Sequence, residues 1–81
     1  MKITCTDYIL SNDTFVFTKE VVTVIDQTVT TKIEITGTQL FDLGSKALCN
    51  CTSEQIAMFG IYHRHLEDGP EDMLNKSVTI D

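Results

Sequence analysis

The sequence predicts a small α+β fold: an antiparallel β-meander of three to four strands, two helices packed on one face, and a short C-terminal strand. Residues 1–36 are rich in threonine and other β-branched side chains, which favour strands. From residue 38 onward apolar residues recur at helical spacing, and residues 77–80 alternate again as a strand does. With 81 residues and no internal linker, we expect a single domain spanning residues 1–81.

The first part of the meander consists of short strands separated by turn-forming residues. Residues 2–10 alternate between apolar and polar positions, with Ile3 and Cys5 on one face. After a cluster of turn formers, residues 14–18 form a second short strand. Residues 19–20 are either a bend or solvent-facing positions within a longer strand.

The second part of the meander contains the clearest strand pattern in the chain. Residues 21–25 are nearly all apolar, which is typical of a central strand covered on both faces. Residues 28–36 alternate strictly and predict an amphipathic strand. Asp26 and Gln27, between these two runs, then form a tight hairpin turn.

Two helices and a short helical segment are predicted after the strands. Thr38 can cap the first helix, whose apolar positions are Leu40, Leu43, Ala47 and Leu48. Thr52, with Gln55 three residues later, matches the capping box and begins a second helix over residues 52–66. Pro70 fits the first turn of a third, short helical segment.

The second helix is apolar more than halfway round. One stripe consists of Ile56, Phe59, His63 and Leu66 and is expected to face the core. The opposite side carries Met58, Ile61 and Tyr62, which one sheet face cannot also cover. An exposed apolar surface of this kind marks an interface, so we expect these three residues to bind a partner and the chain to form a homodimer.

An acidic segment follows this helix. Glu67, Asp68, Glu71 and Asp72 surround a Gly-Pro turn that should hold their carboxylates at the surface. Their mutual repulsion costs a little stability, so folding alone does not require these carboxylates, and a basic protein partner would turn that cost into attraction. The segment is therefore predicted to be a docking surface, with a solvated turn as the alternative.

Composition and charge exclude several classes of function. The net charge of −6 repels phosphate backbones and anionic membranes, so neither direct nucleic-acid binding nor membrane binding is expected. The three cysteines are an odd number, which favours reduced thiols and a cytoplasmic location over a secreted disulfide scaffold. The N-terminal residues lack the apolar segment of a secretory signal, and the sequence has no run suited to crossing a bilayer.

The cysteine and histidine pairs define the alternative, a metal site. Cys49 and Cys51 with His63 and His65 are ligand types that zinc prefers, but the spacings differ from those of zinc fingers. On a helix the two histidines point about 200° apart, so only one could join the cysteines. The set Cys49, Cys51 and His63 is thus the candidate, although we expect no metal or other cofactor.

No catalytic set or phosphate-binding loop emerges from the sequence, so enzymatic activity is not expected. Residues 43–62 are similar to a helix-turn-helix module in spacing only. The second helix would present Glu54 and no lysine to DNA, which suits a phosphate-lined groove poorly. This pair of helices, with the cysteines and histidines, supports the alternative hypothesis of a small zinc- or DNA-binding regulator.

These observations favour a small acidic intracellular binding protein that modulates or inhibits a protein partner by occupying its surface. In size and charge the chain resembles the short acidic accessory proteins of bacteriophages, some of which occupy nucleic-acid-binding surfaces of host enzymes. That resemblance implies a partner that handles nucleic acid. The partner-binding residues would be those of the acidic segment together with the exposed side of the second helix.

Overall fold

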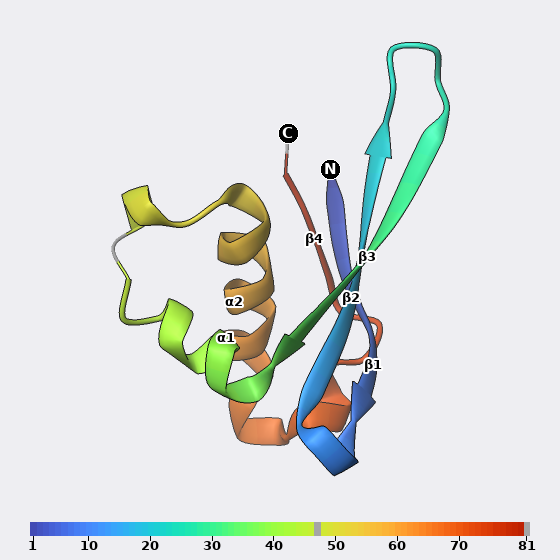
Figure 1. Cartoon of the computed structure of the whole chain (residues 1–81). Helices are drawn as coiled ribbons and strands as arrows, with labels where there is room; N and C mark the ends of the chain where they lie inside the picture. Colours follow the sequence, from blue (N-terminus) through green and yellow to red (C-terminus); the bar gives the residue numbers. More distant parts are fainter. Residues whose placement is uncertain (47, 81) are drawn as a thin grey trace.

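The computed structural model, which describes residues 1–46 and 48–80, is a four-stranded antiparallel sheet with two helices on one face (Figure 1). The strands are β1 (Lys2–Ile9), β2 (Thr14–Val22), β3 (Thr28–Thr36) and β4 (Ser77–Thr79), in the order β3-β2-β1-β4. The first three strands form a meander, and the short C-terminal strand closes the sheet beside β1. The predicted α+β architecture is confirmed. No helix among the described residues is long and apolar enough to cross a bilayer.

Strand β2 is one long strand, so Lys19 and Glu20 are positions within it and not a bend. The apolar residues 21–25 do not form the predicted central strand. Val21 and Val22 are instead the last residues of β2, and the loop after them is closed by a 2.8 Å bond from the amide of Thr23 to the carbonyl of Gln27. The turn is therefore wider than the predicted two residues.

The hairpin between β2 and β3 extends beyond the rest of the sheet (Figure 1). β1 pairs with β2 only as far as Glu20, whereas β3 follows β2 to the pair Val22 and Thr28. Residues 21–29 therefore have no third strand beside them, and we call this segment the arm. Val22, Val24, Ile25 and Val29 are exposed on it because the helices end before they reach it.

Helix α1 (Gly37–Leu43) directly follows β3. Its N-cap is Thr36, two residues earlier than predicted, in a complete capping box with Gln39. The amide of Gly37 donates a 2.8 Å bond to the carbonyl of Asp13, which places this helix start beside the β1–β2 turn. The helix ends at Leu43 and does not continue to Leu48, where a separate 3₁₀ turn begins; Ala47 lies outside the described residues.

Helix α2 (Ser53–His65) begins at the predicted capping box. The hydroxyl of Thr52 accepts the amide of Gln55 at 3.1 Å, and the Gln55 side chain accepts the amide of Thr52 at 2.9 Å. The ammonium group of Lys19 contacts the carboxylate of Glu54 at 2.7 Å and ties the first turn of α2 to β2. The predicted helical segment after α2 is a 3₁₀ turn, Pro70–Met73.

The core lies between the sheet and the two helices. Its buried members are Ile3, Cys5, Phe15, Phe17, Leu40, Leu43, Ala57, Met58, Ile61 and Met73. The side of α2 that packs against the sheet, with Met58 and Ile61, is therefore the side that was predicted to face away from it. Ile56 and His63, from the predicted core stripe, are exposed. Burying the His63 imidazole would have a desolvation cost, which the observed orientation avoids.

Candidate functional site

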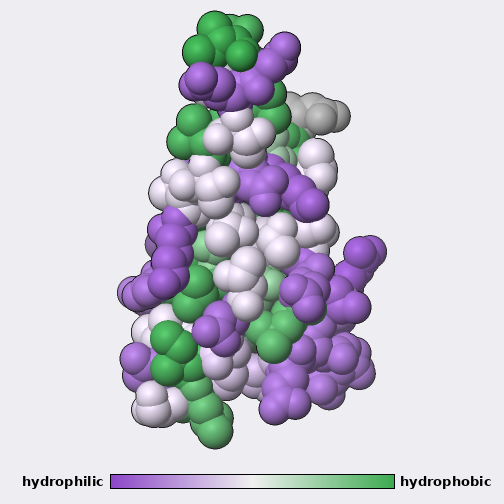
Figure 2. Space-filling model, turned by 90° about the vertical axis from the view of Figure 1, so that its right-hand side faces the viewer, coloured by the Kyte–Doolittle hydropathy of each residue, from purple (hydrophilic) through white to green (hydrophobic). Residues whose placement is uncertain are grey.

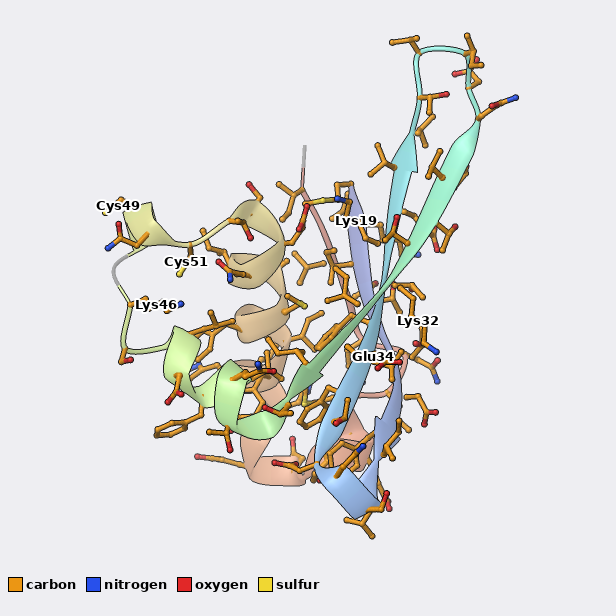
Figure 3. All side chains as sticks on the ribbon, in the orientation of Figure 1. Lys19, Lys32, Glu34, Lys46, Cys49 and Cys51 are labelled. Carbon is orange, nitrogen blue, oxygen red and sulfur yellow. The ribbon has the colours of Figure 1, made fainter. Side chains whose placement is uncertain are left out.

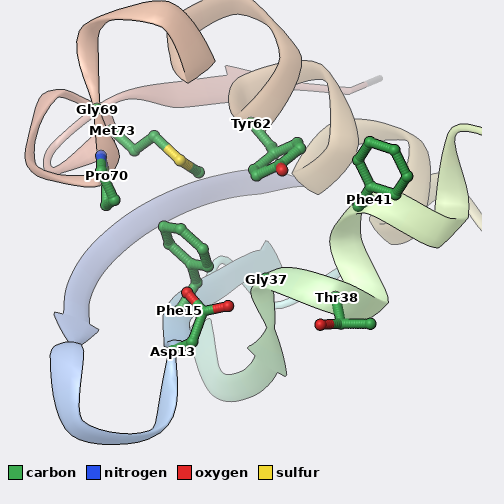
Figure 4. Close-up of a pocket in the computed structure, with 9 residues that line it drawn as sticks. All are labelled: Asp13, Phe15, Gly37, Thr38, Phe41, Tyr62, Gly69, Pro70 and Met73. Atoms are coloured by element: carbon green, nitrogen blue, oxygen red, sulfur yellow. The ribbon is translucent and has the colours of Figure 1, made fainter.

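A hollow with three aromatic side chains in its lining opens at the end of the molecule opposite the arm. Phe15 of β2, Phe41 of α1 and Tyr62 of α2 line it with Pro70 and Met73 of the C-terminal 3₁₀ turn, around a volume of about 390 Å³. Figure 4 shows Phe15 and Tyr62 facing this space from different elements. Four separate segments of the chain therefore build one apolar surface.

Two further hollows adjoin the first and share lining residues with it. One, of about 460 Å³, shares Gly69 and Pro70 and adds Tyr8, Leu10 and Leu74. The other, of about 290 Å³, shares Phe41 and Tyr62 and adds Phe59 and His63. We call the three hollows together the aromatic groove.

Ring-to-ring contacts run along the groove and hold its floor. Tyr8 lies 4.6 Å from Phe15, and Phe15 meets Tyr62 edge to face at 6.1 Å between ring centroids. Tyr62 lies 6.2 Å from Phe59, whose ring stacks on the His63 imidazole at 5.6 Å. Aromatic pairs at these separations contribute about 0.5–1.5 kcal/mol each beyond the area that they bury. The groove is thus preorganised.

The charges at the groove are negative. Asp13, Asp68 and Glu71 line the first two hollows, and no lysine or arginine lies among the described residues that line them. The Tyr8 hydroxyl donates a 2.7 Å hydrogen bond to the Asp13 carboxylate, and this bond raises the pKa of Tyr8. A cationic group entering the groove would meet carboxylates and aromatic faces together.

Gly37 allows the Asp13 carboxylate to occupy this position. A Cβ atom on residue 37 would lie within 2.9 Å of the Asp13 carboxyl carbon, closer than real Cβ contacts. The same aspartate accepts the Gly37 amide through its backbone carbonyl. The β1–β2 turn and the start of α1 therefore pack closely enough to place a carboxylate at the groove.

The structure divides the four carboxylates of the predicted docking segment. Asp68 and Glu71 line the groove beside Pro70, whereas the carboxylate of Asp72 faces the His65 ring at 4.0 Å. Glu67 is exposed and lines none of the three hollows. Two of the four carboxylates thus adjoin an apolar surface that could bind a ligand.

The prediction of an exposed helix face at Met58, Ile61 and Tyr62 was wrong for two of its members. Met58 and Ile61 are 3% and 2% exposed and belong to the core. Tyr62 is half-buried and lies in the aromatic groove. A homodimer through this face would need the core side of α2, so that contact is not available.

The alternative metal set is not assembled. Cys49 and Cys51 lie on the loop between α1 and α2 (Figure 3), and they form no ligand cluster with His63, whose ring stacks on Phe59. Within residues 1–46 and 48–80, the ligand atoms that converge belong to His65, Asp68 and Asp72, all within 4.8 Å of one another. These three could hold a cation only as an exposed, incomplete set.

The helix-turn-helix spacing is also absent. Helix α1 ends at Leu43 and α2 begins at Ser53, so the connection is much longer than the three- to four-residue turn of that module. The 3₁₀ turn Leu48–Asn50 lies within this connection. The two helices pack against the same sheet face, joined by this long connection, and do not have the helix-turn-helix arrangement.

Sequence reasoning missed the aromatic residues that the groove takes from β2 and α1. Phe41 is 66% exposed, beside the buried Leu40 and Leu43 of the same helix. Its position off the core stripe of α1 was the available signal. Asp13 and Phe15 gave no such signal, because the role of Asp13 depends on its contact with Gly37 and that of Phe15 on its contact with Tyr62.

No known family model, curated protein or solved structure matches the chain, so the comparisons assign neither family nor function.

Proposed function

We propose that this protein is a small binding protein that occupies the surface of a basic protein partner, with the aromatic groove as its binding site. The observation that carries the proposal is that Tyr62 of α2, Asp68 of the 3₁₀ turn Leu66–Asp68 and Glu71 of the C-terminal 3₁₀ turn all line one apolar groove. The expected occupant is a segment of the partner that carries arginine or lysine next to an apolar side chain.

Charge and aromatic chemistry both support a cationic occupant. Asp13, Asp68 and Glu71 supply the opposite charge, and the net charge of −6 attracts a basic surface from a distance. The faces of Tyr62 and Phe41 can in addition bind a guanidinium or ammonium group, by about 0.5–2 kcal/mol depending on desolvation. Arginine suits this site better than lysine because its flat guanidinium stacks on aromatic rings.

The shape of the site favours a segment of a macromolecule over an enclosed small ligand. The three hollows adjoin one another along the surface and share residues at each junction. A chain laid along them could place one side chain in each. Small-molecule sites, in contrast, bury most of the ligand in one cavity.

Occupying a basic surface would modulate the partner. A partner that uses the same cationic side chains to hold phosphate groups would lose that activity while bound, which makes inhibition of a nucleic-acid-handling protein the proposed outcome. The free thiols of Cys5, Cys49 and Cys51 fit the proposed reducing, cytoplasmic setting.

A defined peptide tests the site. A labelled peptide that alternates arginine with leucine is titrated by fluorescence anisotropy, next to a peptide of the same length with glutamate for arginine. Binding of the basic peptide alone, with amide shifts at Phe41, Tyr62 and Gly69 in NMR spectra, is the expected result. Replacing Asp68 and Glu71 by their amides should weaken binding about 30-fold, at about 1 kcal/mol per partly desolvated charge.

The control keeps the net charge of that variant but moves the change to the other end of the molecule. Glu20→Gln with Asp26→Asn alters two carboxylates on or beside the arm, away from the groove. It should reduce affinity only slightly, and less so in about 0.5 M salt, where the Debye length is about 4 Å. Equal losses of affinity in both variants would mean that net charge alone causes the attraction. No binding of the basic peptide would contradict the proposal.

A further inference from the structure

The outer edge of β3 is an open backbone edge. β3 pairs with β2 along its whole length, from Thr14 opposite Thr36 to Val22 opposite Thr28, and lies at the end of the sheet order. No hydrogen bond to another described part of the chain covers the outward backbone groups of residues 28–35. The other edge strand, β4, has only three residues.

Such an edge usually needs protection. Natural proteins shorten, bend, charge or cover a free edge, because its unpaired N–H and C=O groups recruit another strand. β3 has nine residues and a continuous register with β2, without a bulge. Its charged side chains are Lys32 and Glu34, which point from the same face and are exposed (Figure 3).

Twofold symmetry restricts how two copies of this edge can pair. In an antiparallel ladder, opposed residues both direct their backbone groups toward each other or both direct them away. Opposed residues of two identical strands must therefore be an even number of positions apart, so the symmetry axis passes beside one residue. Only a few such centres exist along β3.

The two charges select one of these centres. A centre at Lys32 or at Glu34 would place like charges directly opposite each other, which destabilises a sheet. A centre at Ile33 places Lys32 opposite Glu34 of the second copy, and Glu34 opposite Lys32 of the second copy. Lys32 and Glu34 already contact each other within the strand at 3.6 Å, and centres at Thr30 or Thr31 add no opposite charge from the second copy.

We propose that two copies of the chain associate through their β3 edges, antiparallel about a twofold axis beside Ile33, to form one continuous eight-stranded sheet. Thr30 then lies opposite Thr36, and Ile33 opposite Ile33 of the second copy. On the helix side, a hollow of about 580 Å³ runs along this edge beside Ile33 and Ile35. The β3 side chains of the second copy fill part of it.

The same register covers the arm. Val29 comes opposite Gly37, where α1 of the second copy starts, so the rest of the arm extends past the end of that copy's β3. Hydrophobic side chains gather at the tip of the arm (Figure 2), where Val24 and Ile25 are exposed. Edge pairing alone buries little area. Contacts of the arm with the second copy supply part of the roughly 800 Å² per partner that a stable dimer needs.

Charge exchange tests the register, because Lys32 and Glu34 are exposed and can be changed without disturbing the core. Sedimentation of the wild-type protein at roughly 100 μM should give twice the chain mass. Lys32→Glu and Glu34→Lys each set like charges opposite one another in both contacts and should raise the dimer dissociation constant about tenfold. The double exchange should restore it.

Mixing the two single variants is the decisive measurement. Their mixed dimer has a positive residue opposite a negative one at both positions, so the mixture should associate more tightly than either variant alone. Lys76→Glu makes the same change in net charge beside β4 and should leave the mass unchanged, as should the groove variant of Asp68 and Glu71. A monomeric wild-type protein, single variants that dimerise like the wild type, or a mixture that stays monomeric would overturn the proposal.

Discussion

The orientation of α2 makes a sharp prediction, because this helix has two isoleucines in opposite environments. Ile61 is 2% exposed in the core, whereas Ile56 is 41% exposed on the outer side. The change to alanine removes the same atoms from the same helix in both cases. Any difference in the free energy of unfolding must then come from the surroundings of the two side chains.

The magnitude follows from burial. Replacing a fully buried isoleucine by alanine costs about 2–5 kcal/mol, and the better helix propensity of alanine returns about 0.4 kcal/mol. We expect Ile61→Ala to lower the free energy of unfolding by about 3 kcal/mol. Ile56→Ala should lower it by about 1 kcal/mol or less, because most of the space that it leaves is filled by solvent.

Urea denaturation followed by circular dichroism measures both changes. A folded chain of 81 residues has a total stability of about 4–12 kcal/mol, so Ile61→Ala could unfold it at the low end. Ile61→Val, with an expected loss of about 1 kcal/mol, keeps the test usable in that case. Equal losses at both positions, or a larger loss at Ile56, would show that α2 packs by the other side.

Two further predictions concern the thiols and the capping box. A thiol reagent at neutral pH should modify Cys49 and Cys51 in the folded protein but Cys5 only in denaturant, because Cys5 is buried and burial raises the pKa of its thiol to about 11. Since that pKa lies above the ordinary value of 9.0, the contribution of Cys5 to the free energy of unfolding should be constant below pH 9 and fall as the pH approaches 11. Cys5→Ala should reduce this slope, which urea titrations can measure. Rapid modification of Cys5, or no such slope, would contradict its burial. Thr52→Ala should lower the free energy of unfolding by about 1 kcal/mol, whereas Thr52→Ser should change it little, because serine keeps the oxygen that accepts the Gln55 amide. Equal melting temperatures of the two variants would argue against the cap.

The elements that the sequence predicted correctly depend on neighbouring residues. The alternation in residues 28–36 places Ile33 and Ile35 on the same side of β3, as the structure confirms. The capping box of Thr52 and Gln55 needs only four consecutive residues. Local hydrogen bonds and side-chain periodicity are properties of a short segment, so they can be read before any tertiary contact is known.

For other segments, the local pattern suggested one structure and the tertiary contacts decided on another. Thr36 and Thr38 are both suitable caps, and the bond from the Gly37 amide to Asp13 accompanies the earlier start. Residues 21–25 have the composition of a buried strand, yet they extend past β1 and past the helices. Composition indicates that a segment can be buried, but it does not say whether anything reaches that segment.

By itself, the sequence determined the α+β class, the succession of a β-meander, two helices and a closing strand, and the acidic turn at Asp68 and Glu71. Only the tertiary structure decided which side of α2 enters the core and that Phe15 and Tyr62 meet beside that turn. A helix that is apolar more than halfway round has two nearly equivalent faces, and the choice depends on the total burial reached with the sheet. The groove joins segments from β1 to the C-terminal 3₁₀ turn, so no local pattern could encode it.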